Sequence, residues 1–379
     1  MDVTQLAFDA RSMTTGLRKW VETESPTYDS AAVNRMMDVA TRELVILGAE
    51  IQRIPGTLGY GDCVKASFAH PCREKPGILV LGHLDTVHPL GTLDHFGWRE
   101  EGERCYGPGA LDMKSGNYLS LEAIGQLRRA GFDTPLPVTV LFTSDEEVGS
   151  PSTRALIEAE AARHRYVLVP EPARRNGGVV TGRYAIARFE LETRGRPSHA
   201  GLRLGEGVSA IREMAHQIIA IEGMTDANAG YSVGVINGGQ WSNCVSTTCR
   251  AKALVSATTD EKLAEATECM SALKPVGADV QVAVTRDVVR PVWTASDASW
   301  SLYEHAAGLA RGLGFEIPHQ SSGGGSDGNF TGAMGIATLD GLGARGDGPH
   351  TLDEHIVIES LAERGRLMAA LLATLDGTV

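Results

Sequence analysis

The chain has 379 residues, of which 42% are hydrophobic and 22% charged, and its formal net charge is −12. This is ordinary globular composition, and the length predicts two or three domains. The acidic balance argues against nucleic acid and anionic membranes as partners, and no apolar stretch reaches the roughly 18 residues of a membrane span. The first residues lack a signal segment and six cysteines are scattered without a C-x-x-C pair, so we expect free thiols and a cytoplasmic location.

Helical and strand patterns alternate through the first part of the chain. Apolar residues at helical spacing predict helices at about 4–22 and 30–48, and a continuous apolar run predicts a buried parallel strand at 77–81. The next predicted elements are, in chain order, a helix at 115–130, a strand at 138–142, a helix at 152–163 and a strand at 166–169. This β-α-β-α-β order predicts an α/β fold with a doubly wound, mostly parallel sheet.

A different pattern begins near residue 178, where polar and apolar residues alternate. The expected elements are, in chain order, a strand at 186–193, a helix at 206–222, strands at 231–237 and 248–258, a helix at 260–273 and a strand at 279–285. This β-α-β-β-α-β order is typical of a ferredoxin-like module. The alternation indicates that one face of its sheet is solvated or paired with a partner.

Helix and strand patterns of the first kind resume after Pro291. We expect a helix at 298–313, a strand at 335–339 and a closing helix at about 356–375. The simplest account is a discontinuous domain, 1–177 and 291–379, with 178–290 inserted into it.

Imidazoles and carboxylates follow the predicted parallel strands, at the sheet edge where an open α/β sheet binds its ligands. His83 and Asp85 are two residues apart at a strand end, so their side chains share a face. We interpret His83 as a metal ligand and Asp85 as the carboxylate that orients its imidazole. Asp112 follows a glycine-rich bend and precedes a predicted helix, so it could bridge two cations or cap the helix.

Two adjacent carboxylates, Glu146 and Glu147, follow the next buried strand. Burying both near one site is costly unless cations compensate, so the pair indicates a metal site, the alternative being a solvated acidic loop. One of them can bind metal while the other acts as a general base. Two further ligands are Glu171, which follows the last strand of this series, and His350, which follows the glycine-rich stretch 341–349.

These motifs resemble the co-catalytic di-zinc peptidase family that includes glutamate carboxypeptidase, acetylornithine deacetylase, succinyl-diaminopimelate desuccinylase and the aminoacylases, with the glutamate carboxypeptidase branch closest in motif. The resemblance implies five ligands, two on one zinc, two on the other and one bridging: His83 with Glu171, Glu147 with His350, and Asp112. It also implies that Glu146 is the general base, that Asp85 supports the first histidine, and that the Asp112–Met113 peptide is cis. A site of histidines and carboxylates can accept Mn or Co as well as Zn.

The resemblance makes the inserted segment 178–290 a lid and dimerisation domain. The run from Arg196 to Gly201 resembles a motif whose histidine, here His199, reaches the neighbouring subunit's site in a homodimer and helps to stabilise the oxyanion. Asn243 resembles a substrate-contacting asparagine, although the Cys-Val-Ser that follows it departs from the family's usual continuation.

Three further residues are candidates for substrate binding. Arg290 matches an arginine that grips the substrate's free carboxylate in glutamate carboxypeptidase-like members, with a surface ion pair as the alternative. Gly325 lies in a stretch, 323–327, that resembles the family's glycine-rich substrate loop. Arg183 is a second candidate contact for an anion.

The sequence therefore predicts a metal-dependent hydrolase that cleaves the amide bond of small N-acyl amino acids or dipeptide-like conjugates with a free carboxylate. The resemblance implies attack by a metal-bridged hydroxide, with Glu146 as general base. One alternative is an aminohydrolase or deaminase that uses the same site on a non-peptide substrate such as an aromatic acid. Another is a non-catalytic binding protein that has kept the fold.

Overall fold

The computed structural model describes residues 5–379, so residue 4, where the first helix was expected to begin, lies outside the described part. The chain forms two compact units. The first comprises the residues up to Gly182 together with 294–321 and 326–379, and the second comprises 183–293 together with 322–325. The second unit begins later than residue 178 because β8 (Val179–Arg183) still pairs in the sheet of the first. None of the described helices is both long and apolar enough to cross a membrane.

The first unit is built on an eight-stranded sheet in the order β1-β2-β6-β3-β7-β14-β8-β13. Its strands are β1 (Ala49–Ile54), β2 (Cys63–Phe68), β3 (Gly77–His83), β6 (Val138–Thr143), β7 (His164–Val169), β8, β13 (His319–Ser322) and β14 (Ala337–Asp340). The central strands β6, β3, β7 and β14 are parallel, whereas β1, β2 and β8 join antiparallel. The predicted doubly wound α/β sheet is confirmed, and antiparallel strands extend it.

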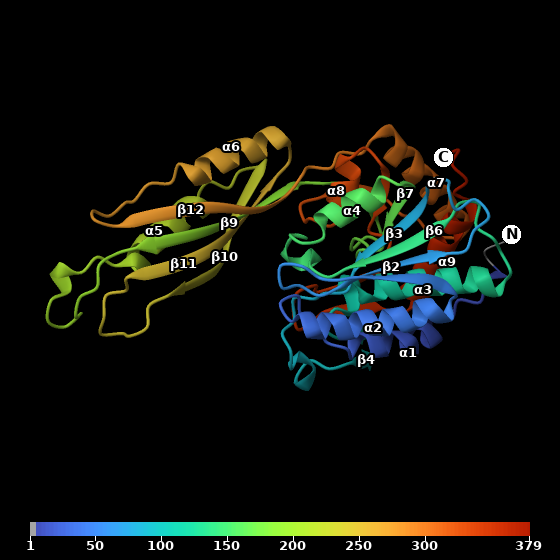
Figure 1. Cartoon of the computed structure of the whole chain (residues 1–379), viewed down its shortest axis with the longest axis horizontal. Coiled ribbons are helices and arrows are strands. Elements are labelled where there is room, and N and C mark those ends of the chain that lie inside the picture. The colour runs from blue at the N-terminus through green and yellow to red at the C-terminus, as the bar shows by residue number, and fades with distance from the viewer. Residues whose placement is uncertain (1–4) are drawn as a thin grey trace. The chain divides into compact units, whose positions relative to one another are not determined.

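Both faces of this sheet are buried, as the apolar run in β3 predicts. Ile78 and Val80 pack into one cluster and Leu79 and Leu81 into another. The first cluster includes side chains of α1 (Ala10–Val21), α2 (Ser30–Ile46), α3 (Ser115–Arg129), α7 (Asp297–Gly312) and α9 (Glu359–Thr374). The second includes side chains of α4 (Arg154–Ala161) and α8 (Gly328–Ala333). Figure 1 shows α1, α2 and α3 on one side of the strands and α4 and α8 on the other.

A small antiparallel sheet in the first unit has the order β15-β16-β5-β4. Its strands are β4 (Arg99–Glu101), β5 (Arg104–Tyr106), β15 (Gly346–Asp347) and β16 (His355–Val357). This sheet ties a segment near the end of the chain to the segment that precedes Asp112. The single turns η2 (Thr92–Asp94), η3 (Ala110–Lys114) and η4 (Glu146–Val148) belong to the same unit.

The second unit has the predicted ferredoxin-like order. It contains β9 (Ala185–Arg194), the turn η5 (Leu204–Glu206), α5 (Ala210–Glu222), β10 (Ala229–Gly238), β11 (Thr248–Ala257), α6 (Asp260–Ser271) and β12 (Gln281–Arg290). The strands form an antiparallel sheet in the order β10-β11-β9-β12, so β10 is an edge strand. Both helices pack on one face of the sheet, where Phe189, Met214 and Val255 share a core.

Candidate active site

The five expected metal ligands come together in the first unit, around the carboxyl ends of its parallel strands. His83 is the last residue of β3, Glu147 lies in η4 directly after β6, and Glu171 follows β7. Asp112 lies in η3 before α3, and His350 lies between β15 and β16. Parallel strands bring their carboxyl ends to one edge, and this is why side chains so far apart in sequence meet.

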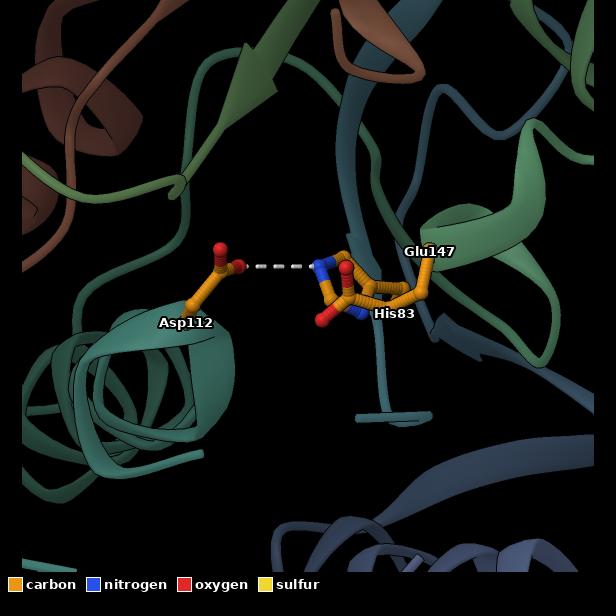
Figure 2. A group of neighbouring side chains, drawn as sticks. All are labelled: His83, Asp112 and Glu147. Atoms are coloured by element: carbon orange, nitrogen blue, oxygen red, sulfur yellow. Dashed lines mark hydrogen bonds and ion pairs between the residues drawn. The ribbon is translucent and has the colours of Figure 1, made fainter. Parts of the chain in front are cut away.

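Asp112 lies between two imidazoles. Its Oδ1 is 3.2 Å from His83 Nε2, and its Oδ2 is 3.3 Å from His350 Nε2. Glu171 Oε1 is 3.7 Å from His83 Nε2, while Glu147 Oε2 is 3.1 Å from His350 Nε2. Figure 2 shows the Asp112 carboxylate directed at the His83 imidazole, and the Glu147 side chain overlaps His83 in this view. Asp112 Oδ1 therefore faces the imidazole of His83, which lies near Glu171, and Asp112 Oδ2 faces the imidazole of His350, which lies near Glu147.

The backbone around Asp112 is not regular helix. Its φ and ψ are −111° and 97°, and the Asp112–Met113 peptide is cis, as the resemblance implies. The alternative role of Asp112 as a helix cap is not adopted, since Lys114 occupies the N-cap position of α3 and no side chain caps the helix there.

The charges of this cluster fit divalent cations. Burial, followed by the neighbouring Asp112 charge, raises the pKa of Glu147 to about 8 and raises the pKa of Glu171 well above its usual range. Hydrogen bonds to Asp112 and Glu147 raise the pKa of His350 to about 11. Protons thus offset the charge of crowded carboxylates where cations are not bound. The ligand atoms of His83, Asp112 and Glu147 lie within 4.8 Å of one another, and so do those of His83, Glu146 and Glu171, so the cluster offers more than one set of donors to a cation.

Asp85 is fully buried behind the cluster and has more contacts than the sequence indicated. Its Oδ1 is 3.4 Å from His83 Nδ1, and the same nitrogen lies closer, at 2.9 Å, to the backbone carbonyl oxygen of Asp85. The backbone N–H groups of Glu146 and Glu147 also donate to its two carboxylate oxygens, each at 3.2 Å. The Thr27 hydroxyl donates to Oδ2 at 2.8 Å. Thr27 was missed because no motif in its own neighbourhood indicates a partner so far along the chain.

Glu146 completes this group. Its Oε2 is 3.9 Å from His83 Nε2, and its side chain is buried in η4. The carboxylate therefore lies beside the ligand cluster, at a distance from His83 similar to that of the Glu171 carboxylate.

The other expected site residues belong to the second unit. His199 and Asn243 lie in neighbouring segments, since the Ala200 N–H donates to the Asn243 carbonyl at 2.9 Å and His199 pairs with Cys244 in a β-bridge. Both His199 and Asn243 are exposed. The structure thus places the two polar side chains on adjacent loops where they are accessible.

The two expected arginines flank the glycine-rich loop. Arg183 Nη1 donates to the carbonyl oxygens of Gly324 and Gly325, at 2.8 and 3.1 Å. A Cβ atom at Gly325 would lie 2.8 Å from Arg290 Cδ, so a side chain at this position would force Arg290 to shift. Arg290 is 3% exposed, so the alternative of a surface ion pair does not hold.

Comparison with known proteins gives a consistent assignment. Residues 79–374 match the sequence model of a protein family described as peptidase family M20/M25/M40. Carboxypeptidase G2 of Pseudomonas sp. (strain RS-16) is 29% identical over 365 residues, covering 94% of this chain and 87% of that protein. Succinyl-diaminopimelate desuccinylase of Caulobacter sp. (strain K31) is 32% identical over 177 residues, which are 43% of each protein.

Solved structures share the fold. An M20 family metallo-carboxypeptidase from Sulfolobus solfataricus aligns with a TM-score of 0.73 at 14% identity, covering 97% of this chain and 99% of that one. Human carnosine dipeptidase 1 aligns with a TM-score of 0.76 at 16% identity, covering 96% of each chain. With its possible metal-binding cluster, the chain belongs to the metal-dependent peptidase family M20/M25/M40, and it is a hydrolase acting on C–N bonds.

Proposed function

We propose that this hydrolase cleaves the amide bond of small N-acyl amino acids or dipeptide-like conjugates that carry a free carboxylate. The observation that carries the proposal is the position of Asp112, whose two oxygens lie 3.2 and 3.3 Å from the imidazoles of His83 and His350. Two ligand groups that share one carboxylate suit a pair of divalent ions. The similarity to carboxypeptidase G2 over most of both chains favours carboxypeptidase-like substrates, and we place glutamate and aspartate conjugates first.

In this proposal His83 and Glu171 hold one ion, Glu147 and His350 hold the other, and Asp112 binds both. Support for this pairing comes from the 3.7 Å between His83 Nε2 and Glu171 Oε1 and the 3.1 Å between His350 Nε2 and Glu147 Oε2. Zinc suits histidine and carboxylate ligands, and Mn or Co can use the same set. When bound, such a pair of ions lowers the pKa of water and polarises a carbonyl group.

Glu146 serves as the general base. Its Oε2 accepts a proton from the attacking water and returns it to the amine nitrogen as the C–N bond breaks. The turn that carries Glu146 and Glu147 is held through two backbone N–H groups by Asp85, which also contacts His83. Asp85 therefore keeps the base and both sets of ligands in a fixed relation.

The second unit supplies the substrate contacts in this proposal. Arg290 pairs with the free carboxylate, because a guanidinium offers two parallel donors to it. Arg183 shapes the loop that contains Gly325, since its Nη1 is directed at that loop's carbonyl oxygens. Asn243 contacts the substrate near His199, which shares in stabilising the oxyanion.

We further propose a homodimer through the second unit, with His199 acting in the partner's site. The edge strand β10 exposes Val235 and Ile236, and α5 exposes Ile211 and Ile219, the last at 73%. Exposed apolar side chains beside an unpaired strand edge favour association with a second copy. A cytoplasmic location is part of the proposal, and it is supported by the six free cysteines.

The test is hydrolysis of a panel of N-acylated amino acids, including glutamate and aspartate conjugates, by the full chain. Each free-acid substrate is paired with its carboxylate-esterified form, and the panel includes an aromatic acid carrying a hydrolysable amine. We expect turnover of free-acid amides that is lost on chelation and restored by zinc. Turnover confined to the aromatic amine would favour the aminohydrolase alternative, and full turnover after verified metal removal would refute the dinuclear mechanism.

A further inference from the structure

A buried carboxylate close to His350 in sequence has no role in the mechanism above. Glu354 is 1% exposed. Its Oε1 accepts hydrogen bonds from the backbone N–H groups of Leu111 and Asp112, at 2.8 and 2.9 Å. Its Oε2 accepts one from the Gly109 N–H at 3.0 Å. Three N–H groups of one short segment therefore converge on a single side chain.

These N–H groups need a partner from outside their own segment. Gly109 has a φ of +69°, and the backbone at Asp112 and Met113 is not helical, so the segment lacks a regular helical hydrogen-bond ladder. A buried backbone N–H without a partner costs free energy comparable to a lost hydrogen bond. Glu354 thus stabilises an irregular backbone that would otherwise be costly.

A fourth donor fixes Glu354 itself. His88 Nε2 lies 2.8 Å from Glu354 Oε2, and the His88 side chain is buried. An ionised carboxylate can only accept hydrogen bonds, so this imidazole nitrogen is the donor. With four donors around two oxygens, the carboxylate has little freedom to move.

The position of Glu354 in the chain gives these contacts their significance. It lies in the same loop as His350, between β15 and β16, while the N–H groups it accepts belong to the segment that carries Asp112. The carboxylate therefore joins the two loops whose side chains, Asp112 Oδ2 and His350 Nε2, lie 3.3 Å apart.

We propose that Glu354 is a positioning residue that sets the separation of Asp112 and His350 for metal binding, with His88 holding its carboxylate in place. The inference rests on the proposed dinuclear function. Partners of metal ligands are worth about 10–100-fold in metal affinity, because they hold the ligands in the binding geometry.

The test uses Glu354→Gln in the full chain, with Glu213→Gln as its matched control. The amide nitrogen of glutamine sets a donor against N–H donors that the carboxylate accepts. Glu213 is also 1% exposed and accepts the backbone N–H groups of Val276 and Gly277, at 2.8 and 2.9 Å, but it belongs to the second unit. The readouts are the dissociation constant of Zn²⁺ by chelator competition, the absorption spectrum of bound Co²⁺, and the melting temperature without metal.

We expect Glu354→Gln to weaken binding of at least one Zn²⁺ by about 10–100-fold and to change the Co²⁺ spectrum. Glu213→Gln should lower the melting temperature and leave both metal readouts unchanged. If Glu354→Gln does not fold, His88→Ala replaces it, and a smaller loss of Zn²⁺ affinity is expected.

Wild-type Zn²⁺ affinity in the folded Glu354→Gln variant, or in His88→Ala where that variant replaces it, would overturn the inference while leaving the proposed function intact. Equal weakening by Glu213→Gln would overturn it too, because the effect would then be one of general stability. A wild-type chain that binds no divalent ion would refute the proposed function and this inference together.

Discussion

Glu146 and Glu147 are neighbours in one turn, and yet the structure gives them different surroundings. Glu147 Oε2 lies 3.1 Å from His350 Nε2, whereas Glu146 Oε2 lies 3.9 Å from His83 Nε2. From the sequence, either residue could have been the ligand. The difference follows from the turn η4, which directs consecutive side chains to different parts of the site.

This difference predicts the behaviour of Glu146→Gln. The variant keeps the five ligands, so metal content should stay at the wild-type value, while turnover should fall by roughly 10²–10⁴-fold because the proton acceptor is lost. Metal analysis and steady-state kinetics on the same preparation check both parts. Turnover close to wild type in a fully metal-loaded variant would show that another group accepts the proton.

The pKa of His350 predicts a pH dependence of metal binding. In the metal-free protein this pKa is raised to about 11 by hydrogen bonds to Asp112 and Glu147. The protonated imidazole therefore stabilises the metal-free fold fully below its unfolded pKa of about 6.5, and this contribution disappears as pH rises through about 11. Since a divalent ion needs the neutral imidazole, metal affinity should increase with pH over this range.

Calorimetry of Zn²⁺ binding near pH 7, in buffers of different ionisation enthalpy, measures the protons released. The wild-type chain should release more protons per Zn²⁺ than His350→Ala. Equal proton release by the two proteins would mean that His350 is already neutral in the metal-free site.

At the scale of elements, the parallel strands could be predicted from sequence and much of what surrounds them could not. β3, β6 and β7 are continuous apolar runs, and this property marks strands that are buried on both faces. The proposed ligands follow these strands closely, so the strand pattern singled out His83, Glu171 and the Glu146–Glu147 pair. The choice of Glu147 within that pair came from the family resemblance. The sequence did not predict β1 and β2, because apolar and polar residues are mixed in both strands. It did not predict β4, β5, β15 and β16, because these strands are too short to show a period.

Glu354 was missed for a different reason. Its partners are backbone N–H groups of an irregular segment more than two hundred residues away. Because almost every residue has a backbone N–H group, the sequence does not indicate which of these groups will bind a buried carboxylate. Its closeness to His350 in the chain is the one local signal, and that signal became informative only with the loop geometry.

The proposed contact between Arg290 and the substrate's free carboxylate predicts how Arg290 affects substrate specificity. Arg290→Ala should raise KM for substrates with a free carboxylate by roughly 10–150-fold, the equivalent of about 1.5–3 kcal/mol for a charge-assisted hydrogen bond. The KM for esterified substrates should rise much less. Arg286→Ala is the matched control, because Arg286 is exposed on the same strand, β12. Equal KM changes for free-acid and esterified substrates would indicate that Arg290 maintains the structure of the loop and does not bind the substrate's carboxylate.

At the scale of the whole molecule, the proposed dimer makes a quantitative prediction. His199→Ala and Glu146→Gln chains, each nearly inactive alone, should regain activity when mixed and allowed to exchange subunits. Random exchange puts half the dimers into the mixed form, and each mixed dimer has one site with both wild-type residues, so activity should reach up to about a quarter of wild type. No recovery after verified exchange would show that His199 does not act across subunits.

The order of the proposed ligands along the chain has a consequence for biosynthesis. His83, Asp112, Glu147 and Glu171 all precede the second unit, whereas His350 follows it. A ribosome-bound chain therefore carries three crowded carboxylates and one imidazole while the second unit, which has a core of its own, is being made. Domains generally fold as they emerge, so the second unit can fold before the first has its final ligand. Under the proposed ligand assignment, stable uptake of both metal ions requires the segment that contains His350, so a chain truncated before residue 350 should fail to bind the second ion.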